Sequence, residues 1–168
     1  MAEAIRRKPA LHRYVNTMPR WVLEAARRVV EELGGNAEAI WSDRPRAREL
    51  QELLDSFLGI SQKKAAMTVM LLWRNCDVEI AEMEGCDVAV DIHLRRVFLR
   101  SGLVERDDPS AMIQAARDLR PELPGALDPP AWTVGRKWCH PRLPECPECA
   151  LTEVCPKLID RAATVGGP

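Results

Sequence analysis

Four cysteines near the end of the chain constrain its fold more than any other sequence feature. They lie within seventeen residues, CHPRLPECPECALTEVC, with three prolines between them. Free structural cysteines do not gather in this way, whereas metal ligands do. Because disulfides are rare inside cells, and the sequence predicts a cytoplasmic protein, we expect a metal site made of Cys139, Cys146, Cys149 and Cys155.

The spacing of these cysteines, C-x6-C-x2-C-x5-C, bears on which metal they hold. Most structural zinc sites pair two C-x2-C hooks across a longer loop. This chain has a single C-x2-C pair inside one compact loop, which wraps a bulky iron–sulfur cluster better than it builds two opposed hooks. We therefore expect a cluster, with a structural zinc ion as the alternative. Cys76 and Cys86 lie outside the pattern and are expected to be buried or half-buried free thiols.

Charge and hydropathy predict a soluble protein without a membrane segment. The charged start, MAEAIRRKPALHRY, lacks the apolar core of a signal peptide, and the longest apolar stretch, 65–73, is too short to span a bilayer. The 168 residues carry a net charge of −1, so the chain is not the strongly basic protein that nucleic acid attracts unaided. Any nucleic-acid-binding face must therefore be local.

The residue pattern predicts an all-α fold. Ala, Leu, Val, Arg and Glu are abundant, aromatic residues are few, and no stretch has the alternation of a strand. The first helix is expected to follow Thr17 and to bury a stripe made of Val22, Ala25, Ala26, Val29 and Val30. Further helices are expected over 46–57, 62–73, 91–102, 108–120 and 128–139, with Asp91, Asp108 and Asp128 as N-caps. The stretch 76–87 is expected to be a loop.

Three stretches together resemble the endonuclease III family of DNA glycosylases. They are DSFLGISQKKAAMTVMLL, VAVDIHLRRVFLRSGL and the four-cysteine tail, and the resemblance runs from about residue 11 to residue 155. It implies a helix-hairpin-helix DNA glycosylase fold with a [4Fe–4S] cluster in the loop 139–155. It also implies a partial helical lobe, 1–87, with the hairpin at about 47–74, and a C-terminal part, 88–168.

The stretch LGIS is the turn of the hairpin in this resemblance. A hairpin of this kind exposes backbone N–H groups at the start of its second helix, and these suit a DNA phosphate. Gly59 allows close approach of the backbone, Ile60 anchors the turn in the core, and Ser61 stands where the family has a second glycine. Taken alone, LGIS would be a plain turn between two helices.

The resemblance assigns catalysis to Lys63 and Asp91. Lys63 lies four residues after Gly59, where family members that also cleave abasic sites carry their catalytic lysine. Lys64 is roughly 100° further round the helix, so it is expected to be a surface or phosphate-contacting cation. Asp91, in VDIH, matches the family's essential aspartate and would face Lys63 across a cleft. Burial and the neighbouring Lys64 would help the lysine to lose its proton, and His93 is expected to pack or to cap. Without the resemblance, the two lysines would be solvated charges and Asp91 a simple helix cap.

The implied function is base-excision repair of double-stranded DNA that carries a damaged base or an abasic site. Lys63 would displace the base, form a Schiff base and cut the strand by β-elimination. Phosphate contacts would come from three cations in or beside the cysteine loop, namely Arg136, Lys137 and Arg142. A further set would either supplement them or form an ordinary solvated face, namely Arg95, Arg96 and Arg100.

Departures from the family leave other functions open. Leu143 and Glu145 stand where the family has cations. The family's first helices precede the point at which this sequence begins, so apolar residues would face water and invite a protein partner or self-association, among them Val22, Val29, Leu53 and Met70. A non-catalytic iron–sulfur DNA-binding module is therefore the alternative to an enzyme. A zinc-stabilised interaction domain is a third hypothesis.

Overall fold

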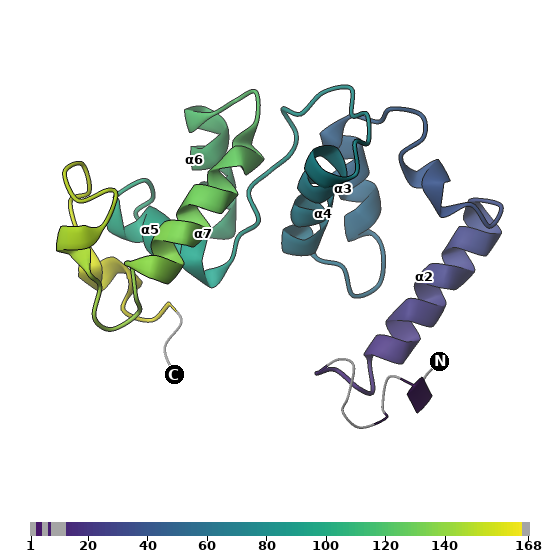
Figure 1. Cartoon of the computed structure of the whole chain (residues 1–168), viewed down its shortest axis with the longest axis horizontal. Coiled ribbons are helices and arrows are strands. Elements are labelled where there is room, and N and C mark those ends of the chain that lie inside the picture. Colours follow the sequence, from purple (N-terminus) through teal and green to yellow (C-terminus); the bar gives the residue numbers. More distant parts are fainter. Residues whose placement is uncertain (1–2, 5–6, 8–12, 166–168) are drawn as a thin grey trace.

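The computed structural model describes residues 3–4, 7 and 13–165. All regular structure in this part of the chain is helical, as predicted (Figure 1). The α-helices include α2 (Met18–Glu32), α3 (Ala47–Asp55), α4 (Gln62–Asn75), α5 (Ile92–Arg100), α6 (Pro109–Leu119) and α7 (Asp128–Lys137). Short 3₁₀ helices lie at η1 (Ala37–Ile40), η2 (Pro124–Leu127), η3 (Cys146–Glu148) and η4 (Ile159–Ala162).

Two hydrophobic cores organise these helices. One lies between α3 and α4, around Leu50, Leu54 and Val69. The other lies among α5, α6, α7 and the tail, around Phe98 and Met112. In Figure 1 the two groups of helices stand side by side, with α2 projecting from the α3–α4 group. Within residues 13–165 the chain passes from one group to the other through the loop that follows α4, and η2 also packs against the α3–α4 core through Leu123 and Ala126.

Helix α2 has the predicted bounds but not the predicted packing. Thr17 is its N-cap without a side-chain capping bond, and Pro19 is its buried residue. Ala26 and Val30 of the expected stripe are exposed, and the rest of that stripe is half-buried. The reason is that α2 packs on the hairpin along one face only, through Trp21 near its start and Arg28 near its end, and its other face is exposed in the described part of the chain (Figure 1). Two residues of other helices were also expected to face water. Met70 is buried, so the expectation is wrong there, whereas Leu53 is 36% exposed.

The turn between α3 and α4 brings α2 against the hairpin. Gly59 has a φ of 88°, which favours glycine, and a Cβ there would collide with the Trp21 ring. Arg28 donates to the Ser56 carbonyl at 3.1 Å and stacks on the Phe57 ring. Helices α3 and α4, joined by a short turn, form the predicted hairpin, and α2 packs over that turn.

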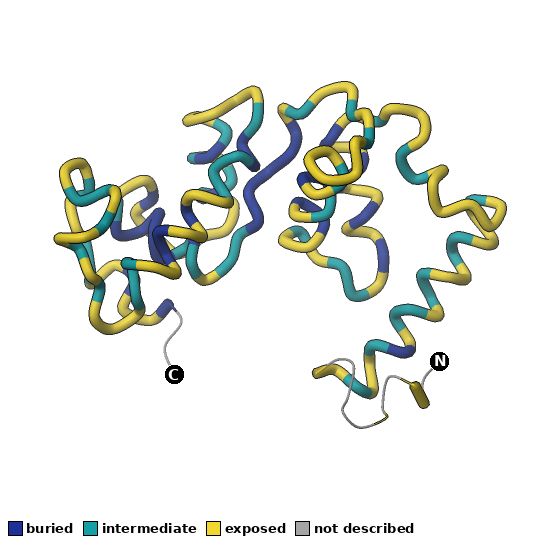
Figure 2. The backbone as a smooth tube through the Cα atoms, in the orientation of Figure 1, coloured by how far each residue is buried: buried dark blue, intermediate teal, exposed yellow. Residues whose placement is uncertain are grey.

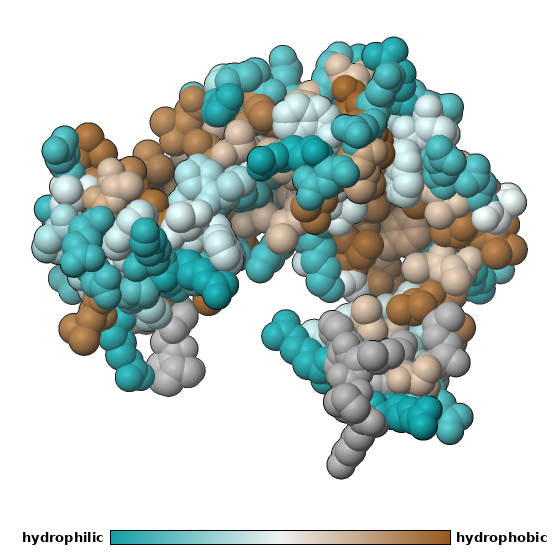
Figure 3. Space-filling model, in the orientation of Figure 1, coloured by the Kyte–Doolittle hydropathy of each residue, from teal (hydrophilic) through white to brown (hydrophobic). Residues whose placement is uncertain are grey.

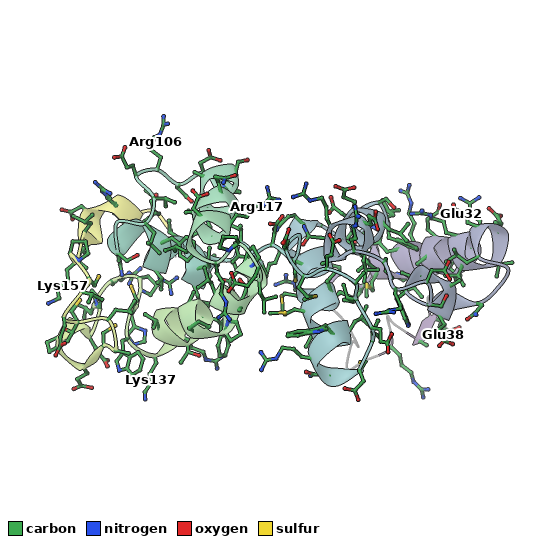
Figure 4. All side chains as sticks on the ribbon, turned by 90° about the horizontal axis from the view of Figure 1, so that it is seen from above. Glu32, Glu38, Arg106, Arg117, Lys137 and Lys157 are labelled. Carbon is green, nitrogen blue, oxygen red and sulfur yellow. The ribbon has the colours of Figure 1, made fainter. Side chains whose placement is uncertain are left out.

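The connection between the two cores is buried, although it has no regular structure. Residues 85–89 are shielded, and Figure 2 shows this stretch as a dark blue link between the two groups of helices. The Asp87 carboxylate accepts two hydrogen bonds from Arg117 of α6, at 2.7 and 2.8 Å, and one from Gln51 of α3. Figure 4 shows Arg117 at the junction. Hydrogen bonds from α3 and from α6 therefore hold the buried connection on both of its sides.

Helices α5 and α7 pack closely because of one glycine. A Cβ at Gly135 of α7 would lie 2.6 Å from the Cβ of His93 in α5, too close for any larger residue. Helix α5 itself ends at the predicted place, where Gly102 has a φ of 78°. None of the helices in the described part of the chain has the length and apolar character needed to cross a membrane.

Candidate active site and cysteine loop

A cleft of about 580 Å³ opens between α4 on one side and the start of α5 and α7 on the other. Its walls are apolar where Met67 and Leu71 of α4 face Leu94 and Trp132. Its ionisable lining residues are Lys63, Arg74, Asp91 and Asp128. Figure 3 shows this face of the molecule hollowed below the junction, between the side that carries α5–α7 and the side that carries α2.

Lys63 and Asp91 meet in this cleft from opposite groups of helices. The Lys63 Nζ lies 3.9 Å from Asp91 Oδ2, and the lysine side chain is 46% exposed against 14% for the aspartate. The other oxygen, Asp91 Oδ1, accepts the N–H groups of His93 and Leu94 at 2.9 Å, so Asp91 is also the predicted N-cap of α5. The pair that the sequence predicted on motif grounds is therefore close in space.

Asp128 is the cleft residue whose position the sequence reasoning missed. It was predicted as the N-cap of α7, but Leu127 takes that position and Asp128 is the first residue of the helix. Both carboxylate oxygens of Asp128 instead accept the N–H of Ala89, at 2.9 and 2.8 Å. The sequence DPP could have indicated that Asp128 is not the N-cap, because Pro130 has no backbone N–H that a capping carboxylate could accept.

The cleft changes the ionisation of Asp128. Burial, which disfavours the charged form, raises the pKa of Asp128 to about 7, and the negative charge of Asp91 acts in the same direction. The Ala89 hydrogen bond and the Lys63 charge oppose this rise without cancelling it. Nearby, burial raises the pKa of the Cys86 thiol to about 12, so this buried cysteine stays neutral. Cys76, which was expected to be at least half-buried, is exposed.

Lys64 points away from the cleft, as its place on the helix predicts. Its amine donates to the Gly59 carbonyl and lies 5.3 Å from the centre of the Trp21 ring. It is therefore not the cation beside Lys63 that the sequence reasoning expected. Ser61, the N-cap of α4, is exposed and makes no side-chain capping bond. Ile60 packs against the α3–α4 core, as predicted.

The four cysteines of the loop 139–155 line one small cavity, together with Arg100 and apolar residues of α5 and α7. Three of the sulfur atoms have hydrogen-bond donors within reach. Leu151 N lies 3.4 Å from Cys149 Sγ, Lys157 N lies 3.4 Å from Cys155 Sγ, and Arg100 Nη1 lies 3.5 Å from Cys139 Sγ. Such donors stabilise thiolates that bind iron or zinc.

The donor set of the cysteine loop therefore fits an iron–sulfur cluster in its chemistry. Sulfur ligands of a cluster bind separate iron atoms around a cuboid and do not all converge on one ion. Over the residues that the structure describes, no three Cys, His, Asp or Glu side chains come together as a site for a metal ion.

Two arginines predicted at the surface are buried and support the cysteine loop. Arg96 donates to the carbonyls of Cys139 and Gly135, at 3.0 and 2.9 Å. Arg100 donates to the carbonyls of His140 and Pro141, at 2.6 and 2.8 Å. Side chains only 1% and 2% exposed cannot contact DNA, so the expectation of a solvated or DNA-contacting face is wrong for both. The spacing of these arginines along the sequence is typical of an exposed charged face. In the structure, backbone carbonyls of the cysteine loop accept the hydrogen bonds that water would accept at the surface.

The other predicted DNA contacts are at the surface. Arg136, Lys137 and Arg142 are all exposed. Arg136 lies over the Trp132 ring at the edge of the cleft, and Lys137 lies over the Trp138 ring, at 4.9 and 4.5 Å from the ring centres. Figure 4 shows Lys137 and Lys157 at the outer edge of the α5–α7 group. Arg95, by contrast, is paired with Asp107.

Comparison with known proteins gives two curated relatives. The chain is 30% identical to endonuclease III of Thermotoga maritima over 135 residues, which cover 80% of this chain and 54% of the relative. It is 30% identical to endonuclease III of a Synechocystis species over 142 residues, which cover 79% of this chain and 52% of the relative. The chain thus spans about half the length of the curated relatives it matches. No family model matches it.

Proposed function

We propose that the chain acts in base-excision DNA repair as a DNA N-glycosylase with abasic-site lyase activity. The observation that carries this proposal is the Lys63–Asp91 pair, 3.9 Å apart in a cleft of about 580 Å³. The similarity of most of the chain to proteins named endonuclease III supports it. The substrate is duplex DNA with a damaged base or an abasic site.

The proposed reaction uses the Lys63 amine as nucleophile. Its lone pair forms a bond to the anomeric carbon of a flipped nucleotide, and the bond to the base breaks with its electron pair leaving on the base, which takes up a proton. The sugar ring opens to a protonated imine. Loss of a proton from the adjacent carbon and departure of the 3′ phosphate then cut the strand. Asp91 would accept the proton of the amine and stabilise the positive charge on the sugar.

In this proposal Cys139, Cys146, Cys149 and Cys155 hold a [4Fe–4S] cluster, with a structural zinc ion as the alternative. The bound group would cross-link a loop with little apolar core of its own and supply no redox step. The loop would present Arg142, and the end of α7 would present Arg136 and Lys137, to the phosphate backbone. The N–H groups at the start of α4, near Gly59, Ile60 and Ser61, would bind a second phosphate, with Lys64 beside them.

Borohydride trapping on a duplex with one abasic site tests this proposal. Hydride converts the imine to a stable amine, so the wild-type chain should form a covalent adduct with the DNA. Lys63→Ala should form none. The matched control Lys64→Ala should reach the same final adduct yield as wild type when the protein saturates the DNA, because its amine points away from the cleft and its loss would change only the affinity for DNA. No adduct from folded, metal-loaded protein, or equal adduct from Lys63→Ala, contradicts the proposal.

A non-catalytic DNA-binding module is the second candidate. The exposed cations of the loop and of α7 lie outside the Lys63–Asp91 pair, so DNA binding does not require the reaction. This candidate is favoured if the chain retains salt-dependent binding to duplex DNA but never forms an adduct. A zinc-stabilised interaction domain, the third hypothesis, would contain zinc and no iron or sulfide, and it would neither bind duplex DNA nor form an adduct. Metal analysis together with the binding and trapping assays therefore separates it from the other two.

A further inference from the structure

Asp128 accepts a backbone hydrogen bond and also lines the cleft that contains the Lys63–Asp91 pair. Its carboxylate holds the N–H of Ala89, which lies two residues before Asp91 in the buried connection. The same side chain lines the cleft that contains Lys63 and Asp91. A change at Asp128 therefore affects the Lys63–Asp91 pair in two ways. It alters the position of the backbone next to Asp91, and it alters the electrostatic potential at Lys63.

The charged groups around Asp128 come from several elements. Helix α4 contributes Lys63 and Arg74 to the same cleft, and the start of α5 contributes Asp91. On the inner side, Asp128 interacts with the buried thiol of Cys86, a residue that also lies in the field of Asp87. Among these groups, Asp91 disfavours the charged form of Asp128 and Lys63 favours it. The balance leaves Asp128 ready to gain or lose a proton near neutral pH.

We propose that Asp128 is a positioning residue of the cleft, which holds the backbone that carries Asp91 and sets the charge that Lys63 experiences. This proposal rests on the proposed function for its catalytic consequence. When Asp128 is neutral, Asp91 is the anion beside the amine. When Asp128 is ionised, a second anion favours the protonated amine, which has no lone pair for attack.

An NMR titration tests the coupling without any need for activity. The Ala89 amide donates to Asp128, so its chemical shift should follow the ionisation of that carboxyl, with a midpoint of about 7. Asp128→Asn should remove this transition, since the amide oxygen still accepts the bond but does not titrate. Lys63→Met should move the midpoint upward and Asp91→Asn downward, each by about half a pH unit or more. A flat Ala89 signal between pH 5.5 and 8.5, or a midpoint that neither variant moves, overturns the proposal.

The pH profile of adduct formation tests the catalytic consequence. The ratio of the trapping rate of Asp128→Asn to that of wild type should rise between pH 6 and pH 8, by about threefold for half a unit of coupling. A purely structural role would lower the rate by the same factor at every pH, so a constant ratio overturns the role in charge. If wild type forms no adduct at all, the proposed function fails, while the Ala89 titration still decides whether Asp128 is coupled to Lys63 and Asp91.

Discussion

Asp91 presents one carboxylate oxygen to its own helix and the other to Lys63. Oδ1 caps α5 through the N–H groups of His93 and Leu94, and Oδ2 lies 3.9 Å from the lysine Nζ. Capping fixes the direction of the carboxylate, because the N–H groups at a helix start have a fixed geometry. The cap thus supplies a rigid anion at the edge of the cleft, opposite an amine on a different group of helices.

The two roles of Asp91 can be separated by substitution. Asp91→Asn keeps an oxygen that accepts the helix N–H groups, so the free energy of unfolding should fall by a few tenths of a kcal/mol, whereas Asp91→Ala should cost about 1 kcal/mol. Both variants lose the charge, so both should form borohydride adduct at least about tenfold more slowly. Chemical denaturation and trapping measure the two effects. An Asp91→Asn variant with the full trapping rate would show that the charge is not needed.

Arg100 should be essential for the cysteine loop, whereas its neighbour Arg95 should not. Arg100→Met removes donors to the carbonyls of His140 and Pro141 and should cost about 3 kcal/mol of stability, since charged hydrogen bonds of buried groups are lost. The iron and sulfide content per chain should fall with it. Arg95→Met, which breaks an exposed pair with Asp107, should cost at most about 1 kcal/mol. Metal analysis and thermal unfolding of both variants provide the measurement, and equal effects would contradict this account.

The exposed cations should determine the salt dependence of DNA binding. Single substitutions to Ala at Arg136, Lys137 and Arg142 should each weaken binding and lower the slope of log K against log salt by about 1, because each removes one phosphate contact. Arg44→Ala is the control, since Arg44 pairs with Glu79 where the chain enters and leaves the hairpin, and not at the turn that is proposed to bind phosphate. Fluorescence anisotropy over a range of salt concentrations gives the slopes. If none of the three substitutions lowers the slope, the DNA does not contact these residues.

Asp128 should make stability depend on pH in a defined direction. Its pKa is raised to about 7 in the folded state, above its value in the unfolded chain, so the folded state binds the extra proton between about pH 4 and pH 7. Stability from this group is therefore present at low pH and is lost as pH rises towards 7, by about 1.4 kcal/mol per pH unit. Asp128→Asn removes this loss, so its stability relative to wild type should increase from pH 5 to pH 7. Urea unfolding at both values checks the sign.

Several features could be predicted from residue order alone because they depend on local interactions. Helix bounds follow from caps and breakers that lie within one turn, as at Asp108 and Gly102. The hairpin, the lysine in its second helix and the four cysteines depend on spacing along a short stretch. The burial of Arg96 and Arg100 could not be predicted, because their partners are carbonyls about forty residues further along the chain.

Residue order is enough to predict helical structure and the start and end of most helices in the described residues, and to single out a candidate lysine, aspartate and set of cysteines. The tertiary structure decided which charges are inside the protein and which are in water. Asp128 could bind its own helix or a distant backbone N–H, and only the packing of α7 against the buried connection directs it to Ala89. The physical reason is that local hydrogen bonds define helices, whereas burial and charge coupling arise from groups that folding brings together.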